Sequence, residues 1–132
     1  MSDYKSLTGI VADADLSAYQ YHAVKLSATN RKVSAMTDAN AERPVGILQN
    51  DPDADGKAAE VATSGQCKAK YGGNVTAGNT LICGNTGLLI ADVEVKDGTA
   101  VDVHHIADAI ESGAINEIHE VLLHTPVRIG LE

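Results

Sequence analysis

Short apolar runs separated by glycine, asparagine and aspartate recur between residues 43 and 90, and this pattern most limits what the chain can fold into. The run 45–48 precedes an Asn-Asp-Pro-Asp sequence, and the run 81–83 precedes Gly84. Breaker residues follow the apolar runs at intervals of about ten to twenty positions, which suits short strands joined by turns. The sequence therefore predicts a mainly β fold, in the form of a compact small β-barrel or β-tulip-like domain.

The composition limits the kind of core that this domain can have. The chain has 132 residues, the size of a single domain with one modest core. It contains no phenylalanine, no tryptophan and four tyrosines, so valine, isoleucine, leucine and alanine must fill that core. Because each of these side chains buries little area, we expect self-association to supply part of the stability.

The charge and hydropathy of the chain exclude two classes of partner. The net charge is -8 and the lysines are scattered, whereas nucleic-acid binding requires a clustered basic face. No apolar run reaches the roughly 18 residues of a membrane span, and residues 1–17 lack a basic region followed by an apolar one. We expect no nucleic-acid partner, no membrane association, and synthesis and folding in the cytoplasm.

Cys67 and Cys83 have no CxxC spacing and are predicted to be buried free thiols.

The N-terminal segment differs in character from the rest of the chain. Residues 1–19 are polar, and their small apolar group, Leu7, Ile10 and Val11, is too short to form a core of its own. This segment is therefore predicted to be an arm that stays flexible until it meets a partner. Residues 20–132 are predicted to form the single β-rich domain.

Two short strands are predicted between residues 21 and 35. Val24 and Leu26 alternate with Lys25 and Ser27, which is the period of a strand with one buried face. The sequence Thr-Asn-Arg at 29–31 is the expected turn between the two strands.

The region from residue 101 to residue 125 fits two structures. Val103, Ile106 and Ile110 fall at helical spacing, so one short helix over 101–111 is a local alternative. An internal similarity favours a strand instead. An apolar run, an acidic or amide residue, a glycine turn and a Glu-Val strand follow one another at 45–61 and again at 106–121. If the first copy is a hairpin, the second should be one too, so we favour a strand over 105–111.

An aspartate-rich turn at residues 51–56 matches the first half of a calcium-binding loop. Carboxylates at alternate positions of such a loop converge on the ion, and a glycine makes the sharp bend. The twelfth position should supply a bidentate glutamate but holds Ala62, and Glu60 lies two positions early. We favour an exposed acidic turn and predict no metal ligands, with a distorted calcium site as the alternative.

Residues 73–80 match the spacing of a phosphate-binding loop but place Asn79 where the lysine should stand. Without that ammonium no side chain of the motif reaches the phosphates, and Gly84 breaks any helix that would follow. A β-turn is therefore predicted here, and we expect no nucleotide and no other cofactor.

The five histidines are the remaining candidates for a chemical site: His22, His104, His105, His119 and His124. If the segments around them pair as strands, His105, His119 and His124 would approach one another, and imidazoles are good zinc ligands. Adjacent His104 and His105 point to opposite faces of a strand, so only one of them could join a cluster. We favour solvent-facing histidines over a metal site. No Gly-x-Ser-x-Gly motif and no activated cysteine is present, so no catalytic residue is predicted.

Several of these strand and turn motifs together resemble one known family. They are the sequence PVGILQNDP at 44–52, Gly56, VATSG at 61–65, TAGN at 76–79, and Leu81. In these residues the chain resembles the capsid cement proteins of tailed bacteriophages, which are related in role to the lambda-type head decoration protein. With the strand segments at 23–26, 109–111 and 120–123, the resemblance extends over about residues 20–125. One departure is Ala107-Asp108, where the family pattern has a glycine beside Ala109.

The resemblance implies a structural virion protein rather than an enzyme. Such proteins bind the outer surface of the expanded capsid, usually as homotrimers, and stabilise it by bridging copies of the major capsid protein. The expected location is therefore the outside of the virion, after synthesis in the host cytoplasm. The predicted arm supplies the expected contact, in which Tyr4, Leu7, Ile10 and Val11 add as a strand to a sheet edge of the shell.

Two other classes of function stay open. One is a different structural virion part, such as a head fibre or a tail adaptor. The other is a small metal-dependent binding protein that would use the aspartate-rich turn and the histidines.

Overall fold

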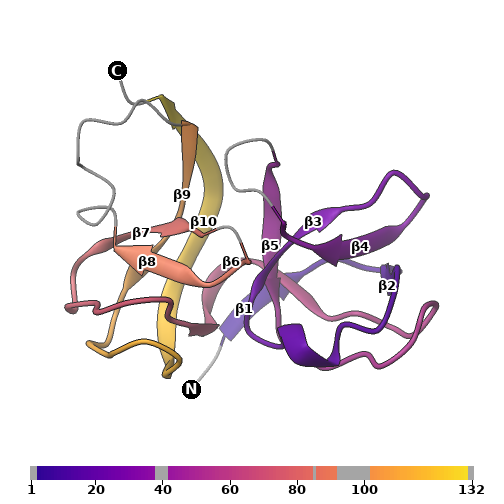
Figure 1. Ribbon diagram of the computed structural model, residues 1–132, viewed down its shortest axis with the longest axis horizontal. Coiled ribbons are helices and arrows are strands. Elements are labelled where there is room, and N and C mark those ends of the chain that lie inside the picture. The colour runs from indigo at the N-terminus through magenta and orange to yellow at the C-terminus, as the bar shows by residue number, and fades with distance from the viewer. Residues whose placement is uncertain (1–2, 38–41, 85, 92–101, 131–132) are drawn as a thin grey trace.

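The structure is a computed structural model that describes residues 3–37, 42–84, 86–91 and 102–130, with the backbone alone described at 102–104 and 125–130 (Figure 1). Within these residues the chain forms ten strands and one short 3-10 helix. The elements are β1 (Asp3–Ser6), β2 (Val11–Ala12), η1 (Ser17–Tyr19), β3 (Ala23–Leu26), β4 (Lys32–Ala35), β5 (Pro44–Leu48), β6 (Val61–Lys70), β7 (Thr80–Cys83), β8 (Leu89–Ala91), β9 (Asp102–Ala109) and β10 (Ile118–Gly130).

All ten strands belong to one open sheet, which confirms the predicted mainly β class. The strand order is β2-β4-β3-β5-β6-β10-β9-β7-β8, and β1 lies beside β6. Only β2 and β4 run parallel among these strands, and the other pairs are antiparallel. In the part of the chain that is described, no helix has the length and apolar character needed to cross a membrane.

The long strand β6 connects the two halves of the sheet. Ala62 pairs with Ser6 of β1 and with Ile47 of β5, and Gln66 pairs with both β1 and β10. Since a strand has two edges, β1 follows one edge of β6 while β5 and β10 share the other. Alternation along β6 explains its position, because Cys67 and Ala69 are buried and Lys68 is exposed. In Figure 1, β7 to β10 lie on the left and β2 to β5 on the right of β6.

The two halves repeat one arrangement of strands. The order β4-β3-β5-β6 in the first half corresponds to β8-β7-β9-β10 in the second. The parallel pair of β2 and β4 has a counterpart in a parallel bridge between Tyr71 and Leu89. The similarity at 45–61 and 106–121 therefore marks two hairpins, β5–β6 and β9–β10, as predicted. The favoured strand is confirmed over most of its length, and β9 replaces the alternative helix because both its edges pair with neighbours.

The strands bury two clusters of side chains, and β6 contributes residues to both. The larger cluster is built mainly from the second half: Ala23, Met36, Ile47, Ala62, Cys67, Ala69, Tyr71, Val75, Leu81, Cys83, Leu89, Ile106, Ala107, Ala109, Val121 and Leu123. The smaller cluster belongs to the first half: Ala12, Leu16, Val24, Val33, Leu48, Ala59 and Val61. Aliphatic side chains dominate both clusters, as the composition predicts.

The N-terminal segment is part of the domain, which differs from the prediction of a flexible arm at residues 1–19. Leu7 and Ile10 pack against the smaller cluster, and Ala12 and Leu16 are buried members of it. The backbone is held as well, since the amide of Leu7 donates to the carbonyl of Val61 at 3.0 Å. The physical reason is that these apolar side chains complete a core that the other strands of the first half leave open. Residue 20 is therefore not a boundary between an arm and a domain over the described residues 3–37.

The predicted strand pair at residues 21–35 is confirmed. Strands β3 and β4 are antiparallel, and the amide of Ser27 donates to the carbonyl of Lys32 at 2.9 Å across the turn. Arg31 closes that turn with a φ of 61°.

Gly65 allows β1 to lie close to β6. Its φ is 103°, a conformation that side-chain-bearing residues rarely adopt. A Cβ added at this position would lie 2.5 Å from the carbonyl oxygen of Asp3 and 2.9 Å from the Cα of Tyr4. Both the backbone conformation and the close approach of β1 therefore require glycine here.

Candidate binding groove

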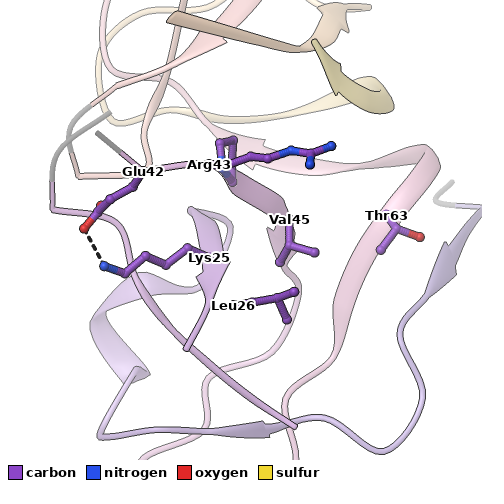
Figure 2. A pocket seen from close by; sticks show the side chains of 7 residues that line it. Lys25, Leu26, Glu42, Arg43, Val45 and Thr63 are labelled. Carbon is purple, nitrogen blue, oxygen red and sulfur yellow. Dashed lines mark hydrogen bonds and ion pairs between the residues drawn. The ribbon is translucent and has the colours of Figure 1, made fainter. Parts of the chain in front are cut away.

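A groove opens where β5 and β6 separate. These strands pair only at Ile47 with Ala62 and at Leu48 with Val61, so toward the start of β5 they diverge. The space between them and β3 has a volume of 580 Å³ (Figure 2). The residues that line this groove are Lys25, Leu26, Glu42, Arg43, Pro44, Val45 and Thr63.

Pro44 explains why the sheet is irregular at this point. Proline has no amide proton to give to a strand ladder, so it suits the first residue of a strand, where it stands in β5. It lies opposite Lys25, and the register of β3 and β5 shifts between Val24 and Lys25. The groove therefore lies at the start of β5, and residues of the neighbouring strands β3 and β6 form its walls.

The floor of the groove is apolar. Leu26 is 57% exposed, which makes it one of the most exposed large hydrophobic residues in the described chain. Val45 is half-buried beside it, and Pro44 is buried. Figure 2 shows Leu26 and Val45 directed into the same space. Covering this surface with an apolar group is favourable, because it removes apolar area from water.

The rim of the groove carries one cation that lacks a partner in the described residues. Lys25 forms an ion pair with Glu42, whose carboxylate also accepts hydrogen bonds from the amide and hydroxyl of Thr37, each at 2.7 Å. Arg43, by contrast, has no hydrogen bond or ion pair with any residue in this part of the structure. Its guanidinium extends away from the Lys25–Glu42 pair (Figure 2). The groove can therefore receive an anionic group next to an aliphatic one.

The four predicted contact residues lie elsewhere and largely face inward. Tyr4 is half-buried against the larger cluster, and its hydroxyl donates to Glu60. Leu7 and Ile10 pack against the smaller cluster. Val11 is half-buried, and its amide donates to the carbonyl of Arg31 at 3.0 Å. These side chains contribute to the stability of the domain.

The aspartate-rich turn is held by lysines and by the backbone. Asp55 lies 2.6 Å from the ammonium of Lys32, and Asp53 lies 3.7 Å from that of Lys57. The carbonyl of Pro52 accepts the amide of Leu16 at 2.8 Å. In the ranges that the structure describes, no three or more histidine, cysteine, aspartate or glutamate side chains are arranged so that they could hold a metal ion.

The segment that matches a phosphate-binding loop forms a turn, as predicted. The amide of Asn79 donates to the carbonyl of Thr76, and the amide of Thr76 donates to the Asn79 side chain, both at 2.9 Å. Gly78 takes a positive φ of 94° within this turn.

His119 lies between two carboxylates at the turn of the β9–β10 hairpin. Its Nδ1 is 2.9 Å from Glu111, and its Nε2 is 3.0 Å from Glu117. Its ring stacks on Tyr71 with 5.2 Å between centroids. The hydrogen bond to Glu117 is the main cause that raises the pKa of His119 above its usual value of 6.5. With both ring nitrogens donating, the protonated form fits this site.

The alternative cluster of His105, His119 and His124, which the sequence did not favour, does not form. His105 pairs with Val127, which is eight positions along β10 from His119, or roughly 25 Å of extended strand. The expectation of a solvent-facing side chain is wrong for His22, which is buried because its Nδ1 donates to the carbonyl of Thr86 at 2.9 Å. Burial lowers the pKa of His22.

Both cysteines are buried free thiols, as predicted. Burial raises the pKa of Cys67 and of Cys83 to about 12 in each case. Thiols with such pKa values are poor nucleophiles near neutral pH.

Sequence reasoning missed the groove. Its residues come from three strands, and no motif connects Leu26 with Arg43 or Thr63. The one signal in the sequence was Pro44 at the start of an apolar run, because a proline in a strand marks an edge or an irregularity.

Comparison with known proteins gives no assignment for this chain. No protein-family model matches it, and no curated protein matches it.

Proposed function

We propose that this protein is a structural virion protein that binds the outer surface of an expanded phage capsid and stabilises the shell. The support from sequence is the resemblance to capsid cement proteins over about residues 20–125. The support from structure is that two of the resembling segments lie in paired strands of the sheet. PVGILQNDP runs through β5 into the following turn, and VATSG forms the first half of β6.

The observation that carries this proposal is the position of β1 at a sheet edge. Among the described residues β1 pairs only with β6, along one of its two edges. The second edge offers backbone amides and carbonyls to a strand from another protein. Asp3, Lys5 and Ser6 are exposed along it. The proposed contact therefore differs from the one predicted from the sequence. A strand of the major capsid protein adds to this sheet, whereas the apolar residues of the N-terminal segment pack against the core.

Many weak contacts of this kind suit a protein that reinforces a shell. Main-chain hydrogen bonds depend little on side-chain identity, and each copy contributes a modest binding free energy. When many copies bridge neighbouring shell subunits, rupture must break several contacts at once. A copy that joins two subunits therefore raises the force at which the shell opens.

Co-sedimentation with purified expanded capsids tests this proposal. Deletion of residues 1–5 removes most of β1 and should abolish binding, whereas deletion of residues 1–2 leaves β1 in place and should not. Thermal unfolding checks that both truncated proteins still fold. A longer deletion through residue 15 is unsuitable because it removes Ala12, which is buried in the smaller cluster. Equal capsid binding by the two truncated proteins would remove β1 from the mechanism.

A further inference from the structure

The most exposed large hydrophobic residues gather at two places. Leu26 lies in the groove, and the other four lie on the β9–β10 hairpin. On the hairpin, the exposed fractions are 44% for Ile110, 59% for Ile115, 45% for Ile118 and 48% for Leu122. Burying a large aliphatic side chain is more favourable than leaving it in water. Both places are therefore candidates for contact with another protein.

The turn of this hairpin, residues 110–118, combines its isoleucines with acidic side chains and is called the hairpin tip below. Glu117 accepts the amide of Ala114 at 3.0 Å, and Glu111 accepts the amide of Glu120 at 3.1 Å. The two ring nitrogens of His119 form hydrogen bonds with these two carboxylates, Nδ1 with Glu111 and Nε2 with Glu117. Because these bonds fix the turn, the tip presents a preorganised surface that loses little conformational entropy on binding.

The groove has the properties that complement this tip. Its floor is Leu26 and its rim carries Arg43, whose guanidinium finds no partner in the described residues (Figure 2). A volume of 580 Å³ admits several side chains, within the range of about 300–1,000 Å³ for binding pockets. The apolar surface of the tip therefore matches the floor, and its glutamates match the cation.

The two surfaces lie far apart on one molecule. In Figure 1 the turn between β9 and β10 lies at the lower left, and β5 starts near the top of the view. One copy therefore cannot place its own tip in its own groove. A contact between different surfaces of two copies is head-to-tail, and it forms a ring if the rotation closes.

We propose that the hairpin tip of one copy docks in the groove of a second copy, with Ile115 against Leu26 and Glu117 facing Arg43. The partner is a second copy of this chain, and the contact does not depend on binding to a shell. This contact is the proposed site of the self-association that the small aliphatic core led us to expect.

Sedimentation velocity of the wild-type protein and of two variants tests the contact. Arg43→Glu reverses the charge of the groove, and Ile115→Lys places a cation on the tip. Each should weaken self-association by at least about tenfold. Arg43→Glu sets a carboxylate against Glu117, and Ile115→Lys sets an ammonium against the apolar floor beside Arg43. Lys57→Glu and Ala54→Lys make the same charge changes at exposed positions of the aspartate-rich turn and should associate like the wild type. Leu26→Glu provides a second groove variant should Arg43→Glu fail to fold.

Mixing the two variants separates a head-to-tail contact from a symmetric one. Arg43→Glu keeps an intact tip and Ile115→Lys keeps an intact groove, so an equal mixture should form dimers although each variant alone is monomeric. A mixture of folded variants that stays monomeric would overturn the proposal. So would a wild-type protein that remains monomeric at about 0.5 mM, or an Arg43→Glu variant that associates like the wild type.

Discussion

Replacing Gly65 with alanine is expected to lower the free energy of unfolding by about 3 kcal/mol. The φ of 103° at this position costs an L-residue about 1–2 kcal/mol. The new Cβ would lie 2.5 Å from the carbonyl oxygen of Asp3, so β1 must move outward by roughly 0.9 Å to restore an ordinary van der Waals contact. That movement stretches the ladder between β1 and β6, and two weakened hydrogen bonds add about 2 kcal/mol. The smaller unfolded-state entropy of alanine offsets about 0.5–1 kcal/mol of this loss.

Gly78→Ala is the matched control for this prediction. Gly78 has a similar φ of 94°, but nothing lies within 4 Å of a Cβ added there. It should therefore show the backbone strain alone, a loss of about 1 kcal/mol. Urea unfolding followed by circular dichroism measures both variants against the wild type. Equal losses for the two variants would refute the reasoning, because the close approach of β1 would then contribute nothing.

Three further predictions follow from buried or paired side chains. His119→Gln should lose more stability at about pH 6 than at about pH 9, as measured by thermal unfolding. The raised pKa of His119 makes its contribution complete below the usual value of 6.5, and that contribution is lost as the pH rises through the folded-state pKa. Ile106→Ala should cost about 2–5 kcal/mol in urea unfolding, since Ile106 is fully buried, and a loss under 1 kcal/mol would contradict its place in the core. Cys67 and Cys83 should react with a thiol reagent at about pH 8 only after denaturation, because burial raises both pKa values to about 12.

Local patterns predicted much of the sheet. The alternation at residues 21–35 predicted β3 and β4, and the internal similarity favoured strand over helix for β9. These signals work because turn residues and the period of two act over a few positions. The similarity also predicted two hairpins of one kind, although it did not reveal that β6 joins both halves.

The N-terminal segment was misread because its partners are distant in sequence. Leu7 and Ile10 look isolated along the chain, but they pack against a cluster that includes Val33, Leu48 and Val61. The groove was invisible for a similar reason, since it depends on where two strands stop pairing. Register of that kind is decided by the packing of the whole sheet and has no local signal.

Quantitative mass spectrometry of virus particles purified from the source of the sequence tests the central claim most directly. The amount of this chain is compared with that of the major capsid protein in the same particles. The account predicts comparable abundance, as expected for a protein that coats the whole lattice. A few copies per particle would indicate a head fibre or tail adaptor instead, and absence from the particles would contradict a virion role altogether.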